Sequence, residues 1–253
     1  PEHLYNTFAE QLSGLPDATV LYPGHDYIAN NLRFTLDREP GNAKAGALLT
    51  QIEKSTGQEV GRIGIEAQIE NAKGLINVDA IAQASPRVET IIFGPADFMA
   101  SINMKSLVVG EQPPGYDVGD AYHYILMRIL MAARAYDKQA IDGPYLAIKD
   151  LDGYRRVAGR SAALGFDGKW VLHPDQVAAA NEVFSPKQED YDHAELILDA
   201  YDYYTSAAGG AKGAVMLGDE MIDEASRKMA LVISAKGRAA GMQRTKSFEK
   251  PEA

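Results

Sequence analysis

The stretches "IEAQIENAKG" (residues 65–74) and "VETIIFGPADF" (residues 88–98) decide the fold. In the first, apolar and polar residues alternate, which is the period-two pattern of a strand with one buried face. A helical pattern follows over residues 71–84, and the second stretch is an apolar strand that also runs into a helix. Glu70 ends the first strand, and Asp97 follows the second strand 27 residues later. Two consecutive β-α units indicate parallel strands.

The alternation of strands and helices continues along the chain. We predict further strands at "GPYLAI" (143–148) and "KWVLHP" (169–174), with helices over residues 96–104, 119–137, 150–165 and 175–184. Four such units in succession indicate an α/β fold with a parallel sheet. After these units we predict a helix over 187–207, a hairpin in "GAVMLGDEMID" (213–223) and a helix over 224–239.

Composition limits the class of protein. With 253 residues and 46% hydrophobic residues, the chain can bury the core of one large domain or two small ones. The net charge of −10 argues against a nucleic-acid partner, although an anionic substrate remains compatible with it. The absence of cysteine excludes disulfides and sulfur metal ligands, and we expect a cytoplasmic location. No run approaches the ~18 apolar residues of a membrane span, so we expect no membrane partner.

Residues 46–240 resemble the C-terminal half of citrate lyase β-subunit-like CoA-ester lyases, in the HpcH/HpaI aldolase family. The matching stretches are "IEAQIENAKGLINVDAIA", "SPRVETIIFGPADF", "GFDGKWVLHPDQV" and "GAVMLGDEMIDEA". Malyl-CoA, methylmalyl-CoA and citramalyl-CoA lyases belong to this family. The resemblance implies a TIM-type β/α barrel, and the four strands of this chain look like its last four. The predicted fold is therefore a partial TIM-type barrel with a C-terminal helical lid.

The N-terminal residues 1–45 resemble another family, the metallo-β-lactamase-fold hydrolases of the glyoxalase II kind. There a Gly-His turn supplies a metal ligand, which would be His25 here. The clustered H-x-H-x-D-H motif of that fold is absent, so we expect no active site in this segment. The predicted organisation has four parts: this fragment over 1–45, a half barrel over 46–186, a helix, hairpin and lid over 187–240, and a disordered tail over 241–253.

Glu70 and Asp97 are the candidate metal ligands. Parallel barrel strands end at one face, so the two carboxylates can converge there. Close carboxylates repel each other unless they share a proton or a cation, and an oxygen-only pair with open positions suits Mg²⁺. The alternative is that both are solvated carboxylates at strand ends. The family resemblance implies that these positions bind Mg²⁺, with Mn²⁺ as the alternative metal.

The "GPADF" turn is the candidate substrate site. The resemblance implies that Pro95, Ala96 and Asp97 hold the carboxylate of the keto-acid fragment, with the backbone N–H groups of Ala96 and Asp97 as donors. The alternative is a plain β-α turn. Glu66 and Gln68 share a strand face with Glu70, so they either hydrogen-bond the site or face solvent.

Asp223 is the candidate catalytic residue. It stands at a predicted helix N-cap, and capping alone is one interpretation. In the resembling lyases the acidic residue of this segment belongs to a lid and acts as the acid/base, often in a neighbouring subunit. His173 ends a predicted strand and invites a general-base role, but we interpret it as structural.

The resemblance implies a Mg²⁺-dependent lyase that cleaves a 3-hydroxyacyl-CoA of the malyl-, methylmalyl- or citramalyl-CoA type. The products would be acetyl-CoA or propionyl-CoA and a 2-oxo acid. A CoA thioester is the expected partner, and we expect a homo-oligomer because a half barrel leaves two open sheet edges. Two alternatives stay open: a non-catalytic remnant that oligomerises, and a malyl-CoA thioesterase on the same scaffold.

Overall fold

The computed structural model describes residues 43–250 of the chain, which divides into two compact units. The first unit contains residues 1–64 and 83–87, and the second contains residues 65–82 and 88–253. The predictions for residues 1–45 therefore lie almost wholly outside the described residues, and His25 is among those left outside.

In the first unit a buried carboxylate joins a helix to the loop that follows it. Helix α3 (Ala43–Ser55) carries Glu53, whose side chain accepts hydrogen bonds from the amides of Gly61 (2.9 Å) and Ile63 (2.8 Å). Both terminal nitrogens of Arg87 also donate to Glu53, at 2.7 and 2.8 Å. These contacts, with the Arg87 hydrogen bond the strongest, lower the pKa of Glu53 to about 2 against the effect of burial.

The second unit contains a parallel sheet whose strands lie in chain order. The strands are β1 (Ile65–Ile69), β2 (Val88–Phe93), β3 (Gln139–Asp142) and β4 (Gly168–Lys169), and the order is β1-β2-β3-β4. The predicted strand over 143–148 is wrong, because β3 ends at Asp142 and the Gly143-Pro144 pair follows it. A proline has no N–H to donate to a sheet ladder, so the strand stops before it.

Helices connect the strands as expected. They are α4 (Ala72–Ile76), α5 (Val78–Gln83), α6 (Pro95–Ser101), α7 (His123–Ala135), α8 (Leu151–Leu164) and α9 (Asp175–Phe184). Local sequence sets several ends. The Asn71 side chain caps α4 by accepting from the Gly74 amide, and Asp150 caps α8 through the Gly153 amide. Gly165 ends α8 in the left-handed conformation that glycine adopts most readily.

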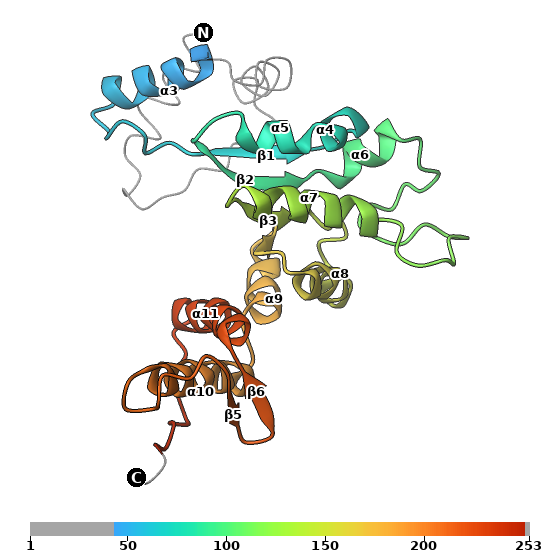
Figure 1. The fold of residues 1–253 in the computed structure, drawn as a ribbon. Helices are drawn as coiled ribbons and strands as arrows, with labels where there is room; N and C mark the ends of the chain where they lie inside the picture. The colour runs from blue at the N-terminus through green and yellow to red at the C-terminus, as the bar shows by residue number, and fades with distance from the viewer. Residues whose placement is uncertain (1–42, 251–253) are drawn as a thin grey trace. The chain divides into compact units, whose positions relative to one another are not determined.

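The core lies on one face of the sheet. Ile69, Ile91 and Ala140 are buried there with side chains of α5, α6 and α7, and Figure 1 shows α7 running beside β2 and β3. Because strand side chains alternate, Gln68 and Glu70 project from the opposite face of β1. That opposite face is the side that a closed barrel would enclose.

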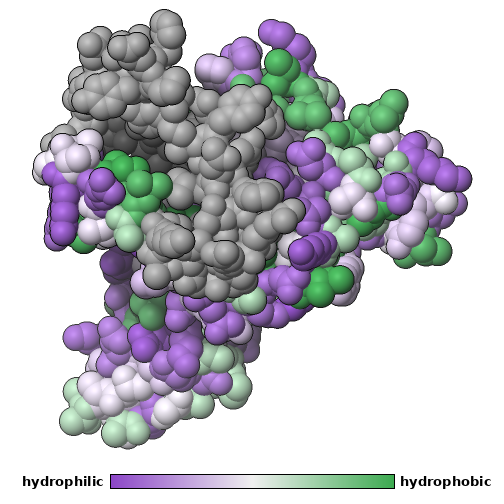
Figure 2. Space-filling model, turned by 90° about the horizontal axis from the view of Figure 1, so that it is seen from above, coloured by the Kyte–Doolittle hydropathy of each residue, from purple (hydrophilic) through white to green (hydrophobic). Residues whose placement is uncertain are grey.

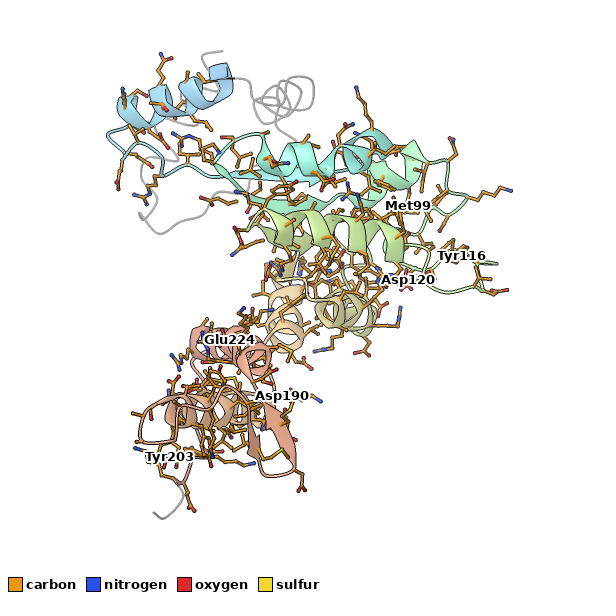
Figure 3. All side chains as sticks on the ribbon, in the orientation of Figure 1. Met99, Tyr116, Asp120, Asp190, Tyr203 and Glu224 are labelled. Atoms are coloured by element: carbon orange, nitrogen blue, oxygen red, sulfur yellow. The ribbon has the colours of Figure 1, made fainter. Side chains whose placement is uncertain are left out.

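The loop between α6 and α7 is fixed at its base and apolar at its exterior. Asp120 pairs with Arg160 of α8 at 3.1 Å, and the Arg160 guanidinium lies 5.2 Å from the centre of the Tyr122 ring. Figure 3 labels Asp120 and Tyr116 in this loop. Leu107 and Val118 are almost fully exposed, and Figure 2 shows hydrophobic side chains at the surface on the side where this loop lies.

The C-terminal segment has its own apolar cluster. It consists of α10 (Gln188–Thr205), the hairpin β5 (Val215–Leu217) and β6 (Glu220–Ile222), and α11 (Glu224–Ala239). Both the predicted hairpin and the predicted helix over 224–239 are confirmed. A Cβ atom on Gly237 would lie 2.2 Å from the Tyr191 ring, so glycine at this position allows α11 to pack closely on α10. None of the helices within residues 43–250 combines the length and apolar character that a bilayer crossing needs.

Residues 241–250 have no helix or strand, but long-range contacts hold part of them. The Thr245 amide donates to Asp192 at 2.8 Å, and the carbonyl of Gln243 accepts from the Gln188 side chain at 2.9 Å. The Phe248 ring packs against Tyr203 and Tyr204 of α10. These contacts run against the predicted disorder of this part of the tail. Partners more than 40 positions away in the chain are invisible to a local reading of composition.

Candidate active site

The structure brings Glu70 against the turn that follows β2. Glu70 comes directly after β1, and the Gly94 amide donates to the Ile69 carbonyl at 2.9 Å. A Cβ atom on Gly94 would lie 2.7 Å from the Cβ of Glu70 and 2.6 Å from Nε2 of Gln68. A Cβ atom cannot approach other side-chain atoms that closely. Position 94 must therefore be glycine for Gln68 and Glu70 to lie over the turn.

The turn leads into α6, whose first residues carry the predicted substrate contacts. Pro95 occupies the first helical position, where its missing N–H has no intrahelical partner to lose. The Phe98 amide donates to the Gly94 carbonyl at 3.1 Å, and the Phe98 side chain is buried. Ala96 and Asp97 are exposed in the same helical turn. Burial of Phe98 therefore anchors the turn, and Asp97 stays accessible in the first turn of α6.

Gln68 supports Glu70 directly. Its Nε2 donates to Oε2 of Glu70 at 2.9 Å, so one of the two polar residues that share the strand face of Glu70 hydrogen-bonds to it. Loss of hydration, and then the charge of Glu89, raise the pKa of Glu66 on the same face. The hydrogen bond to Gln68 restricts the orientation of the Glu70 carboxylate.

The donor set of this site fits a hard divalent cation. Within residues 43–250 there is no cluster of three or more His, Cys, Asp or Glu side chains that would hold a metal ion on its own. Two carboxylates from neighbouring strand ends suit Mg²⁺, which keeps waters and completes its coordination with substrate oxygens. Glu70 and Asp97 are the predicted pair, and Asp97 is accessible from solvent.

Asp223 lies at the start of α11 and caps that helix. Its Oδ1 accepts hydrogen bonds from the amides of Ala225 (2.9 Å) and Ser226 (3.0 Å), and the Ser226 hydroxyl is 3.3 Å away. The Ser226 hydroxyl also accepts from the Asp223 amide, which completes a capping box. The backbone hydrogen bond from Ser226 is the main reason why the pKa of Asp223 is lowered. Figure 3 labels the next residue, Glu224, in this segment. The capping role is confirmed, and the catalytic role stays a prediction.

His173 makes a local contact. Its Nδ1 accepts a hydrogen bond from the Asp175 amide at 3.2 Å, at the beginning of α9. This contact supports our structural interpretation of His173.

Sequence reasoning missed a buried ion pair at the ends of β3 and β4. Nζ of Lys169 lies 2.8 Å from Oδ2 of Asp142, and the two side chains are only 2% and 3% exposed. Burial lowers the pKa of Lys169, and the Asp142 carboxylate opposes that shift. The available signal was charge at adjacent strand ends, in "IDGP" (141–144) and "GKW" (168–170), since charged residues seldom lie in a core unpaired.

A second missed cluster lies around Tyr145, which is buried. Its hydroxyl lies 2.9 Å from a Glu111 carboxylate oxygen and 2.8 Å from Oδ2 of Asp150, and Arg156 also pairs with Glu111. Burial and the two carboxylates raise the pKa of Tyr145. The cluster attaches the α6–α7 loop to the start of α8. No motif in the sequence links Glu111 to Tyr145.

Four parallel strands in chain order, connected by helices, are the arrangement of part of a TIM-type barrel. Solved structures agree with this fold. A citrate lyase from Burkholderia xenovorans LB400 is similar with a TM-score of 0.67 and 20% identity, covering 88% of this chain and 72% of that one. The protein CitE from Mycobacterium tuberculosis, in complex with magnesium, acetoacetate and coenzyme A, gives 0.57 and 20% over 81% of this chain and 83% of that one. The predicted fold class is confirmed.

The chain belongs to the HpcH/HpaI aldolase/citrate lyase family, whose model matches residues 38–174. An L-malyl-CoA/beta-methylmalyl-CoA lyase of Cereibacter sphaeroides is 37% identical over 195 residues, which is 74% of this chain and 60% of that protein. A malyl-CoA/beta-methylmalyl-CoA/citramalyl-CoA lyase of Chloroflexus aurantiacus is 34% identical over 67% of this chain and 51% of that protein. The chain thus spans about 60% of the length of the first of these relatives. The family match starts at residue 38, and the hydrolase resemblance of residues 1–45 finds no support in it.

Proposed function

We propose that this protein is a Mg²⁺-dependent carbon–carbon lyase that acts on a 3-hydroxyacyl-CoA of the malyl-CoA type. The observation that carries this proposal is the close packing of Gly94 on Gln68 and Glu70, because Gly94 starts the turn that leads to Asp97 in α6. The names of the relatives support the substrate class, because they are lyases of malyl-CoA, methylmalyl-CoA and citramalyl-CoA.

In this proposal each residue of the strand ends has a distinct role. Glu70 and Asp97 hold Mg²⁺ or Mn²⁺, and Gln68 orients Glu70 through its hydrogen bond. The bound metal supplies Lewis-acid stabilisation of the oxygen charge that develops as the C–C bond breaks. The turn of Pro95, Ala96 and Asp97 binds the carboxylate of the 2-oxo acid fragment through the backbone N–H groups of Ala96 and Asp97.

Asp223 is the proposed acid/base. Cleavage of the C–C bond leaves the acyl-CoA fragment as an enolate, and this carbon must gain a proton to give acetyl-CoA or propionyl-CoA. In the reverse reaction the same carbon loses a proton, so one carboxyl group can serve both directions. The lowered pKa of Asp223 fits the base form, which removes the proton in the condensation direction.

We also propose that the protein is a cytoplasmic homo-oligomer. In the described part of the chain, β1 and β4 are the outer strands of the sheet and have no neighbour on one side. An open edge of this kind pairs readily with another strand.

A non-catalytic, metal-binding protein is the second candidate. The four parallel strands within residues 43–250 are half of the eight that close a TIM-type barrel. A site assembled from half of the strands can hold a cation without supplying every substrate contact.

An assay with malyl-CoA separates these functions. The chain is incubated with malyl-CoA and Mg²⁺, and acetyl-CoA, glyoxylate, malate and free CoA are quantified by mass spectrometry. We expect equal amounts of acetyl-CoA and glyoxylate, and no product with EDTA or with the Glu70→Gln variant. Malate and free CoA in their place would identify a thioesterase. Cation binding without any product would favour the non-catalytic protein.

A further inference from the structure

The ends of β3 and β4 are joined through Gly143, the residue after β3. Nζ of Lys169 donates to Oδ2 of Asp142 at 2.8 Å and to the carbonyl of Gly143 at 2.6 Å. The Gly143 amide in turn lies 2.8 Å from Oδ1 of Asp142. Both polar backbone groups of Gly143 are therefore held by the buried Asp142–Lys169 pair.

Gly143 also touches the turn that carries the proposed site. A Cβ atom on Gly143 would lie 2.2 Å from the carbonyl oxygen of Phe93 and 2.2 Å from Cδ of Pro95. The backbone of Gly143 thus packs directly on the last residue of β2 and the first residue of α6. Any displacement of Gly143 toward β2 moves Pro95, and Ala96 and Asp97 follow it in the helix.

The contacts then continue to β1. Gly94 precedes Pro95 and packs against Gln68 and Glu70, again without room for a side chain. A continuous line of contacts runs from Lys169 through Gly143 and the turn to Glu70. The ion pair lies at one end of this line, and the proposed metal ligands lie at the other.

We propose that Asp142 and Lys169 are positioning residues, which fix the Gly94–Asp97 turn relative to Glu70 by clamping Gly143. The expected effect on the cation site rests on the proposed function. A general contribution to stability explains the pair less well, since a buried ion pair is often no more stabilising than apolar side chains of similar size. Here the pair holds the N–H and carbonyl groups of Gly143 in fixed positions.

We call the contacts from the Asp142–Lys169 pair through Gly143 to the turn the Gly143 clamp. Two variants test it, one at Lys169 and one at Gly143. Lys169→Met removes the ammonium group and keeps the length of the side chain. Gly143→Ala keeps the ion pair and places a methyl group against Phe93 and Pro95. Arg155→Met is the matched control, because it removes an exposed ion pair of the same unit, Arg155–Glu182 at 2.9 Å.

Hydrogen exchange of the α6 amides reports how firmly the turn is held, and the measurement needs no metal or substrate. In Lys169→Met and Gly143→Ala, we expect the amides of α6 to exchange at least ~10-fold faster than in the unmodified chain. The amides of α7 should keep their rates, and Arg155→Met should change neither helix. Unchanged α6 exchange in both folded variants would overturn the proposal, as would an equal acceleration in α6 and α7.

Mn²⁺ affinity, measured by electron paramagnetic resonance, tests whether the proposed cation site depends on these residues. We expect Lys169→Met and Gly143→Ala to weaken Mn²⁺ binding ~10–100-fold, as is common when groups behind metal ligands are altered. If Asp97→Asn does not weaken Mn²⁺ binding, the metal assignment fails while the exchange experiment still decides the positioning role. If Asp97→Asn abolishes binding and the two clamp variants bind Mn²⁺ normally, the positioning inference is wrong.

A double variant covers the case in which Lys169→Met does not fold because Asp142 is left buried without a partner. Asp142→Asn combined with Lys169→Met removes both charges, and we expect it to fold and to keep the fast exchange in α6. If all three variants fail to fold by circular dichroism, the clamp is a determinant of the whole barrel, and the proposal of a local role is wrong.

Discussion

The strand-end region and the C-terminal segment both carry acidic residues predicted to act in the site. The hydrogen bonds that these carboxylates accept differ between the two regions. At the strand ends, Glu70 accepts a side-chain hydrogen bond from Gln68, and Asp97 projects from the first turn of α6 into solvent. In the C-terminal segment, Asp223 is engaged by two backbone amides and a hydroxyl of its own helix. Asp97 is thus accessible from solvent, whereas Asp223 already caps its helix.

The difference bears on whether one carboxylate can serve both as a helix cap and as a catalytic acid. A capping aspartate is held ionised by backbone N–H groups, which lowers its pKa and weakens it as a general acid. All three hydrogen bonds of the cap go to Oδ1 of Asp223, so in the proposed catalysis the proton is carried by Oδ2 while the cap is kept.

The largest effect is expected at the strand ends. Asp97→Ala should abolish the rise in melting temperature that Mg²⁺ gives the unmodified chain, because it removes one of two proposed ligands. The measurement is a thermal melt with and without Mg²⁺. Asp152→Ala is the control, since this carboxylate is 97% exposed on α8, and its Mg²⁺ response should stay normal. An unchanged shift in Asp97→Ala would mean that any Mg²⁺ binds elsewhere.

The second effect tests the other side of the comparison. Asp223→Asn keeps the size and most of the capping ability of the residue but removes the titratable proton. In an active preparation we expect normal folding and substrate binding, with turnover reduced at least ~10²-fold. The measurement is kcat and KM for release of acetyl-CoA from malyl-CoA. Nearly full activity in this variant would leave Asp223 with its capping role alone.

A smaller, pH-dependent effect is expected in the first compact unit. The pKa of Glu53 is lowered from 4.5 to about 2 in the folded protein, so its contribution to stability is present above about pH 4.5. That contribution is lost as the pH falls from about 4.5 toward about 2, since the unfolded chain binds the proton first. Urea unfolding across this range should show a steeper loss of stability for the unmodified chain than for Glu53→Gln. Equal slopes would contradict the role of the Arg87–Glu53 pair.

Much of the fold follows from local signals in the sequence. The hairpin was predicted from Gly218-Asp219 between short apolar runs, and α11 from a capping residue before a periodic pattern. The strand ends were predicted from parallel order, which places Glu70 near the turn of Asp97. These features depend on a few neighbouring residues, and the chain carries them in each segment separately.

The missed features depend on distant partners. Asp142 and Lys169 are 27 positions apart, and neither residue type alone indicates a buried ion pair. The apolar run after Gly143 resembles a strand, but Tyr145 is buried by packing with side chains of α8 and α9. The tail contact of Thr245 with Asp192 spans 53 positions. Packing of this kind is decided only when the whole domain assembles.

Gly94 and Gly143 have a consequence for how this protein tolerates genetic change. Neither residue has a side chain, so neither can take part in chemistry, yet an added methyl group at either one would overlap atoms of the neighbouring strand end. In a deep mutational scan scored for function, both positions should be as intolerant as Glu70. A map of intolerant positions would then mark as functional two residues that bring no side chain to the site.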